Sequence, residues 1–259
     1  MKKKKIITIA LIAAFSLCAV FTGMMAYWQW NDGQQSKDDF SALAELVAEE
    51  PAAPEQTPAP TDEPEAEPDE RELAYEKYKA LYEQNNDFVG WITIDGTAIN
   101  YPVMQSIGSP DYYLKHNFEK AYSDYGVPYV DKACAVGLSA NTVVYGHHMK
   151  NGTMFSDLCN YTDADFCKEH PIINFDTLSG FGEYQVVAVF KFNTNHEDFR
   201  YNEYTQMNEE QFKEFMSQVH ARQCYDTGID AEFGDQLITL STCEYTYNNG
   251  RFVVVAKKV

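Results

Sequence analysis

The sequence predicts a mainly β fold for its C-terminal part, a closed or nearly closed β-barrel, joined to a membrane anchor by a spacer. Three observations lead to this prediction: an uncharged N-terminal segment of 25 residues, an acidic proline-rich segment after it, and a series of short β-type runs with turns between them. The chain has 259 residues, a length that fits one large domain or two small ones.

The N-terminal segment has the pattern of a membrane-spanning helix. Four lysines form a basic start, and residues 6–30 carry no charge. Roughly 20 apolar residues are enough to cross the hydrocarbon core of a bilayer as a helix. Aromatic side chains, which gather at membrane interfaces, stand at the far end: Tyr27, Trp28 and Trp30. We therefore expect a single-pass protein of the cell membrane. Its cytoplasmic tail is residues 1–5, its transmembrane anchor is residues 6–30, and its folded domain is extracellular.

A cleaved signal peptide is the alternative for this segment. Its apolar core usually has about 7–15 residues, which is shorter than the run found here, and no clean small-x-small cleavage site follows. A lipoprotein site would require a small residue before Cys18, where the sequence has Leu17. These features favour an uncleaved anchor.

Residues 31–70 have the composition of an acidic, proline-rich linker. Residues 32–70 hold 13 acidic residues and one lysine, and six of the ten prolines lie between positions 51 and 68. Because the charges repel one another and few apolar residues can be buried, we expect an extended, solvated stalk. A short helix over residues 40–50 is the local exception that helical spacing allows. An electrostatic contact with a partner is the alternative function of the stalk.

Charge limits the partners of the chain. The formal net charge is −19, of which −12 falls on residues 32–70 and −11 on residues 71–259. Nucleic-acid binding depends on lysine and arginine contacts with phosphates, so we expect no nucleic-acid partner. Six cysteines are too few for a small disulfide-built protein.

Residues 71–259 form the predicted globular domain. It begins with a helical pattern, and β-type runs follow at 88–94, 98–101, 127–130, 142–145, 184–192, 237–241 and 252–257. The pair Asp95-Gly96 between the first two runs is a hairpin signal. One later helix is expected after the N-cap Asn208, with an apolar face made of Phe212, Phe215, Met216 and Val219.

Cys243 is the candidate nucleophile. It ends the apolar run 237–243, and the polar Glu244 follows, so its thiol can face a cleft while a strand fixes its position. A small buried hydrophobic residue is the alternative interpretation. The other cysteines form no CxxC pair, which disfavours zinc or redox sites, and the sequence does not assign disulfide partners among them.

Two histidines, His147 and His148, follow the strand at 142–145, and Gly146 before them allows a turn. Adjacent residues on an extended chain point opposite ways, and no cluster at metal-ligand spacing accompanies this pair, so we expect no metal site. The remaining histidines are isolated and are interpreted as surface or structural residues: His116, His170, His196 and His220.

Arg251 opens the last strand after the turn at 248–250. If this strand and the cysteine strand form a hairpin, the guanidinium lies near Cys243, where it favours a thiolate and offers donors to an oxyanion. A solubilising edge-strand charge is the alternative. A cysteine, a histidine and an arginine at strand ends together indicate an acyl-transfer site. His147 precedes Cys243 by 96 residues, the reverse of the order in papain-type enzymes.

At these residues the chain resembles a class B sortase. The carrying motifs are Tyr145-Gly146-His147-His148-Met149 with Gly152-Thr153-Met154-Phe155, and Thr239-Leu240-Ser241-Thr242-Cys243 followed by Arg251. Upstream motifs agree in order: Val89-Gly90-Trp91-Ile92, Ile99-Asn100-Tyr101-Pro102-Val103, Tyr113-Leu114 and Asn117-Phe118. The likeness extends over residues 75–259.

The resemblance implies an eight-stranded sortase-like β-barrel with an N-terminal helix and a helix before the cysteine strand. It implies a transpeptidase on the outer face of the cell membrane of a Gram-positive bacterium. Such enzymes cut secreted proteins at a C-terminal sorting motif after its threonine, through a thioester, and transfer them to an amine of peptidoglycan or its precursor. No ATP, metal or other cofactor is expected, because the thioester stores the acyl group.

By position, the resemblance assigns Cys243 as nucleophile, His147 as catalytic histidine and Arg251 as oxyanion stabiliser. Ser241, Glu244 and Tyr201 are the expected substrate-binding positions, although the match is poor over residues 193–202. A membrane-tethered cysteine peptidase, a pilin-polymerising sortase and a non-enzymatic surface-binding module are the alternatives. They differ in their products: a free acid, a pilin polymer, or no reaction of Cys243.

Overall fold

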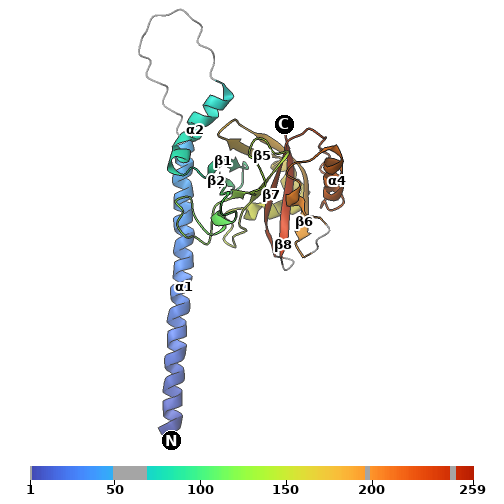
Figure 1. Cartoon of the computed structure of the whole chain (residues 1–259). Coiled ribbons are helices and arrows are strands. Elements are labelled where there is room, and N and C mark those ends of the chain that lie inside the picture. The colour runs from blue at the N-terminus through green and yellow to red at the C-terminus, as the bar shows by residue number, and fades with distance from the viewer. Residues whose placement is uncertain (1, 49–68, 196–198, 246–248) are drawn as a thin grey trace, which may run out of the picture.

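The computed structural model describes residues 2–48, 69–195, 199–245 and 249–259, and its centre is a closed β-barrel (Figure 1). The strand order around the barrel is β1-β2-β3-β4-β7-β8-β6-β5. The strands are β1 (Phe88–Thr93), β2 (Asn100–Met104), β3 (Tyr129–Val130), β4 (Asn141–Tyr145), β5 (Ile172–Thr177), β6 (Glu183–Asn193), β7 (Leu237–Glu244) and β8 (Gly250–Lys258). The predicted eight-stranded barrel is confirmed.

Two parallel strand pairs determine where the strand ends meet. The β2–β3 and β4–β7 pairs are parallel, and the other pairs around the barrel are antiparallel. Because β4 and β7 run in the same direction, their C-terminal ends lie side by side, with Tyr145 paired to Ser241. The β7–β8 hairpin places the start of β8 at the same edge, with Arg251 opposite Cys243.

The barrel strands are apolar and mostly buried, which fits strands that are covered on both faces. Val143 and Val144 of β4, Leu240 of β7 and Val254 of β8 are fully buried. The 3₁₀ segment η2 (Ser156–Thr162) packs on β6, β7 and β8, and the short helix α3 (Ala164–Glu169) follows it. The strand β5 was not among the expected runs, because Asn174 and Asp176 interrupt its apolar pattern.

Helix α4 (Glu209–His220) agrees with the sequence prediction. The Asn208 side chain accepts a hydrogen bond from the Gln211 amide, and the Gln211 side chain accepts one from the Asn208 amide, which is a complete capping box. The four apolar residues of the predicted face are buried, and α4 packs on β6.

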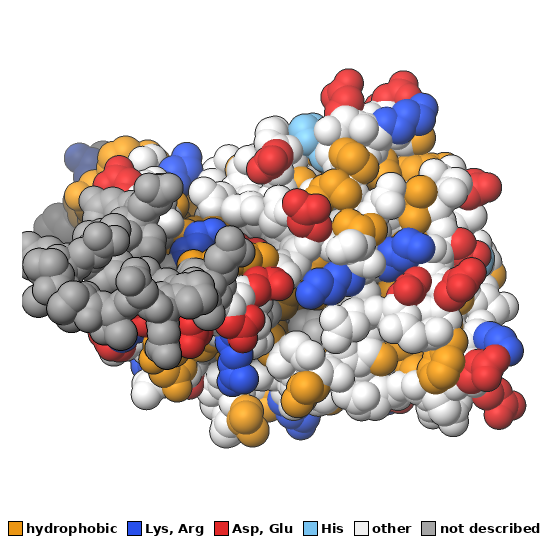
Figure 2. All heavy atoms as spheres, turned by 90° about the horizontal axis from the view of Figure 1, so that it is seen from above, with side chains coloured by type: hydrophobic (Ala, Val, Ile, Leu, Met, Phe, Trp, Pro, Cys, Tyr) orange, Lys and Arg blue, Asp and Glu red, His pale blue; other side chains and the backbone are white. Residues whose placement is uncertain are grey.

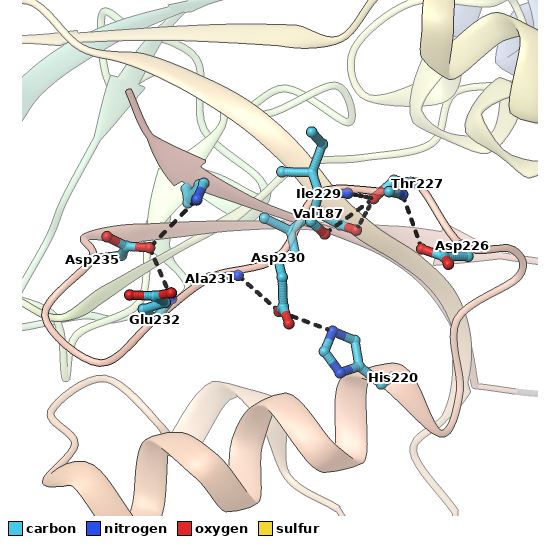
Figure 3. A network of polar contacts seen from close by, with 11 residues as sticks. Val187, His220, Asp226, Thr227, Ile229, Asp230, Ala231, Glu232 and Asp235 are labelled. Atoms are coloured by element: carbon cyan, nitrogen blue, oxygen red, sulfur yellow. Dashed lines mark hydrogen bonds and ion pairs between the residues drawn. The ribbon is translucent and has the colours of Figure 1, made fainter.

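A long loop joins α4 to the start of β7 and is held by local polar contacts (Figure 3). Thr227 donates its hydroxyl to the Val187 carbonyl at 2.6 Å, which ties the loop to β6. His220 at the end of α4 lies 3.3 Å from the Asp230 carboxylate. These contacts fix the point at which β7 enters the barrel, at the end opposite Cys243.

Helix α2 (Glu70–Gln84) leads into β1 and is tied to β5. The buried Tyr78 donates its hydroxyl to Asp176 at 2.6 Å, and Lys77 contacts the same carboxylate oxygen at 3.2 Å. The short 3₁₀ segments η1 (Tyr112–Leu114) and η3 (Tyr201–Glu203) complete the ordered elements.

Helix α1 (Lys2–Ala48) is longer than the predicted anchor. Among the described residues it is the one helix long and apolar enough to cross a membrane, by length and composition. It continues through residues 31–39, where the sequence predicted an extended stalk, and into residues 40–48, where the sequence allowed a short helix. Phe40 and Leu43 are buried against the domain, so tertiary packing stabilises as helix a segment whose charge favours solvation. The rest of the predicted linker, residues 49–68, lies outside the described residues.

The surface seen from above, the end away from the N-terminus of α1, has mixed character. Acidic, basic and hydrophobic side chains are interspersed there (Figure 2). The negative charge of the domain is therefore not gathered into one acidic patch on this face.

Candidate active site

Cys243 and Arg251 face each other across the β7–β8 hairpin. They are directly paired, and Arg251 Nη1 donates to Cys243 Sγ at 3.7 Å and to the Gly250 carbonyl at 3.0 Å. The thiol is partly exposed. The strand pairing thus holds a guanidinium beside the sulfur.

Gly146 brings the chain after β4 against the end of β7. Its amide donates to the Ser241 carbonyl at 3.1 Å, and its carbonyl accepts a hydrogen bond from the Thr242 hydroxyl at 2.8 Å. A Cβ at Gly146 would lie 2.5 Å from the ring of Phe155, so this close approach requires glycine. His147 lies two residues after Tyr145, and Cys243 lies two residues after Ser241, the strand partner of Tyr145.

The ring of His147 is oriented by a backbone carbonyl. Its Nε2 lies 2.7 Å from the Leu114 oxygen. A carbonyl oxygen only accepts, so Nε2 carries the proton and Nδ1 is the free atom of the neutral ring. Burial lowers the pKa of His147; the bond to Leu114 and the charge of Asp124 act upward, and Lys115 acts downward. The site of His147 therefore favours the uncharged form of its ring.

His148 points to a different partner, as expected for neighbours on an extended chain. Its Nδ1 donates to the Cys243 carbonyl at 2.9 Å, and Cys159 Sγ lies 3.4 Å from the same nitrogen. Tyr245 donates its hydroxyl to the His148 carbonyl at 2.7 Å. His148 therefore contacts the backbone of Cys243, a role that the sequence pattern did not indicate.

Tyr201 and Ser241 are in direct contact, with 2.8 Å between their hydroxyl oxygens. Tyr201 is only 4% exposed and packs edge-on against Phe192 and Phe190. It also lines a pocket of about 450 Å³ together with Arg251. The other lining residues are Asp111, Tyr129, Asp131, Tyr145, Phe192, Thr194, Arg200, Asn202 and Glu203. Because Arg251 lines this pocket and contacts Cys243, the pocket adjoins the thiol.

Glu244 has a different environment from the other expected substrate-binding residues. Its carboxylate lies 3.2 Å from Lys191 of β6, and its side chain is 11% exposed. Alternation along β7 turns it to the face opposite Cys243. It is not among the residues that line the pocket.

Several pocket residues were not identified from the sequence. Tyr145 donates its hydroxyl to Asp131 at 2.8 Å, and Tyr129 lies 3.3 Å from Asp111. Tyr145 belongs to the motif that precedes His147, but its direction into the pocket depends on the pairing of β4 with its neighbours. The aspartates had no local signal.

All six cysteines are free thiols. Among the residues that the structure describes, no group of three or more His, Cys, Asp or Glu side chains could hold a metal ion. The chemistry available in the described site is that of a thiol, an imidazole and a guanidinium.

Comparison with known proteins identifies the family of the chain. The Sortase domain family model matches residues 92–259. Sortase B of Listeria monocytogenes serovar 1/2a is 35% identical over 187 residues, which cover 71% of this chain and 74% of the relative. Sortase B of Staphylococcus aureus strain NCTC 8325 is 33% identical over 184 residues, 70% of this chain and 74% of the relative.

Solved structures give the same result. The Staphylococcus aureus sortase B–substrate complex superposes with a TM-score of 0.73 at 28% identity and covers 88% of this chain and 98% of that one. Clostridium perfringens sortase B gives 0.64 at 30% identity, covering 70% and 98%. The chain therefore belongs to the sortase family of cysteine transpeptidases, and within it to class B.

Proposed function

We propose that Cys243, His147 and Arg251 carry the transpeptidation. The Cys243 thiolate attacks the threonine carbonyl of a sorting motif, and a tetrahedral oxyanion forms. Imidazolium His147 gives its proton to the leaving amine as the peptide bond breaks and a thioester remains on Cys243. An acceptor amine then attacks the thioester, loses a proton to His147 and releases the thiolate. The observation that carries this proposal is the pairing of Cys243 with Arg251 beside the end of β4.

Arg251 is proposed to act on charge at two stages. Its contact with the sulfur places a positive charge beside the nucleophile before attack. Its planar guanidinium has further N–H donors, which can hold the oxyanion that develops at the attacked carbonyl. The lowered pKa of His147 fits this scheme, because a histidine disfavoured as a cation donates its proton readily once charged.

The pocket beside Arg251 is the proposed site of the sorting motif. Its tyrosine and phenylalanine side chains offer apolar walls, and Asp111, Asp131 and the backbone offer polar groups. A solved relative is a sortase B–substrate complex, so a protein of this fold binds its substrate non-transiently enough to be solved with it. Tyr201 would form part of the pocket wall, with its hydroxyl held by Ser241. Glu244 lies on the opposite face of β7, so it would influence the site through its contact with Lys191.

We propose that the substrates are secreted proteins with a C-terminal sorting signal and that the acceptor is an amine of peptidoglycan or its precursor. In this proposal α1 crosses the cell membrane once, over residues 6–30, with residues 1–5 in the cytoplasm and the barrel outside. The lysines before the apolar run and the aromatic residues after it support this topology.

The test is a cleavage assay of the full chain with a library of sorting peptides, read by mass spectrometry of enzyme and products. Wild type should form a thioester on Cys243 and transfer the acyl part to an added amine. Cys243→Ala should form neither product, while Cys224→Ala, which removes another exposed thiol, should react as wild type does.

Two outcomes would contradict the proposal. Turnover by Cys243→Ala would exclude the assigned nucleophile. Release of the free acid alone, in the presence of abundant amine, would indicate a cysteine peptidase instead of a transpeptidase.

A further inference from the structure

The loop that orients His147 is a small folded unit of its own. Leu114, whose carbonyl holds His147 Nε2, ends η1, and Lys115 follows it. The Ser123 amide donates to the Lys115 carbonyl at 3.0 Å, and the Lys115 ammonium contacts Asp124 at 2.8 Å. We call residues 112–125 the His147 support loop. The second arm of this loop, residues 122–125, is thus bonded to Lys115, the residue next to the carbonyl that holds the imidazole.

Helix α1 binds the second arm of this loop. Asp32 Oδ1 accepts a hydrogen bond from the Ser123 hydroxyl at 3.0 Å, and Asp32 Oδ2 accepts one from the Asp124 amide at 3.0 Å. Both carboxylate oxygens are therefore engaged by the loop. Hydrogen bonds to a charged acceptor are stronger than those between neutral groups.

The next residue of α1 brings the helix into close contact with the loop. Gly33 is buried, and a Cβ at this position would collide with the ring of Tyr125. The Tyr125 hydroxyl accepts a hydrogen bond from Asn151 at 2.9 Å, on the segment that follows His148. The support loop thus contacts His147 through Leu114, and it contacts the segment after His148 through Tyr125.

The same helix carries the apolar run. Asp32 lies two residues beyond Trp30, and α1 has no break between them. Further along, Phe40 packs edge-on against Tyr101 of β2 with 4.9 Å between ring centroids, and Leu43 is buried. The helix that carries the apolar run is therefore packed against both the support loop and the barrel.

We propose that Asp32, at the domain end of the membrane anchor, is a positioning residue for His147. It touches neither substrate nor thiol. It fixes the support loop, and the loop fixes the imidazole through the Leu114 carbonyl. This inference rests on the catalytic role proposed for His147, and it makes the anchor of this sortase a part of the catalytic geometry as well as a tether.

The experiment compares Asp32→Ala with Asp38→Ala in the full chain reconstituted in lipid nanodiscs. Asp38 is an exposed acid of the same helix, which makes it a matched control. Because a misplacement of about 1 Å can cost up to 10²-fold in rate, we expect Asp32→Ala to lower kcat of transpeptidation roughly tenfold. KM for the sorting peptide and the melting temperature should remain those of Asp38→Ala. Asp32→Asn keeps a carbonyl oxygen for one of the two bonds and should have an intermediate kcat.

Two results would overturn the inference. One is a kcat of Asp32→Ala equal to that of Asp38→Ala. The other is a loss that follows the melting temperature, with no intermediate value for Asp32→Asn, which would indicate a purely structural role. His147→Ala in the same nanodiscs separates this inference from the proposed function: full turnover by that variant would remove both, whereas an inactive His147→Ala with an active Asp32→Ala would remove only the inference.

Discussion

At the scale of single residues, the site depends on how neighbouring charges act on one imidazole. Lys115 and Asp124 form an ion pair beside His147, and they act on its pKa in opposite directions. Burial has the largest effect and lowers the pKa. His147 should accordingly titrate below its ordinary value of 6.5 in the folded enzyme.

Replacing Lys115 should raise the pKa of His147. Lys115→Ala removes a cation that disfavours the imidazolium, and it releases the Asp124 carboxylate, which favours it, so both changes act upward. The measurement is an NMR titration of the His147 ring resonances in wild type and variant.

The control for that titration is Lys150→Ala, which removes an exposed lysine three residues from His147. It should leave the midpoint where it is in wild type. A midpoint in Lys115→Ala that stays in place or moves down would contradict the electrostatic account.

At the scale of elements, the parallel β4–β7 pair determines the distance between the histidine and cysteine segments. Beyond the last paired residues the two strand ends remain joined by the bonds of Gly146 with Ser241 and Thr242. His148 adds a side-chain bond to the carbonyl of Cys243. The thiol is therefore held by its backbone as well as by the hairpin with β8.

His148→Ala should weaken the enzyme without abolishing its chemistry. Loss of the donor leaves the Cys243 carbonyl without its side-chain partner, which should lower the free energy of unfolding by about 1–3 kcal/mol. The thioester should still form, more slowly than in wild type, because His147 and Arg251 remain. Urea denaturation and thioester kinetics by mass spectrometry measure the two effects.

Tyr245→Phe is the comparison for this variant. It removes only the hydroxyl that donates to the His148 carbonyl from an exposed side chain, so its effect should be smaller. Complete absence of thioester in His148→Ala, with His147→Ala still active, would instead assign the proton transfer to His148.

At the scale of the whole molecule, the direction of the barrel strands relative to α1 decides on which side the catalytic edge lies. β8 runs from Arg251 toward the C-terminus, which lies on the side away from the N-terminal end of α1 (Figure 1). The catalytic edge of the barrel consequently faces the same way as the apolar run. The contact of Asp32 with the support loop, two residues beyond Trp30, places that loop next to the end of the run.

Photo-crosslinking can test the resulting expectation that the catalytic edge lies close to the lipid surface. p-Benzoylphenylalanine in place of Tyr122, which is 70% exposed beside Ser123, should react with lipid headgroups or chains in nanodiscs. The same group in place of Phe233, which is 53% exposed in the loop before β7, should not. Equal lipid adducts at both positions would contradict this orientation.

The sequence was informative wherever a structure depends on near neighbours. The hairpin signal Asp95-Gly96 lies in the turn between β1 and β2, and Gly96 has a φ of 77° there. The capping residue Asn208 and the apolar face of α4 are present as predicted. Cys243, His147 and Arg251 were identified as candidates because each lies where an apolar run meets a turn.

Distant contacts were not accessible in this way. Tyr145 and Asp131 lie at the neighbouring strands β3 and β4, and they share one pocket with Arg251 of β8 only because strands far apart in the chain pair around the barrel. The sequence allowed a short helix from residue 40 onward, but the helical conformation of residues 31–39 was missed for the same reason. Its acidic residues indicate solvation, and only the domain surface, absent from a local pattern, supplies the partners of Asp32, Phe40 and Leu43.

The sequence by itself therefore determined the local elements and the candidate catalytic side chains, since periodicity, capping and turn chemistry act over a few residues. The family came from the resemblance of the motifs around His147, Cys243 and Arg251. The tertiary structure decided the rest. Parallel pairing brings the segments of His147 and Cys243, 96 residues apart, to the same edge of the barrel, and docking of α1 joins the helix that carries the apolar run to the loop that holds the imidazole. Both depend on closing long loops of chain around a common core, and the resulting pairings leave no short-range pattern in the sequence.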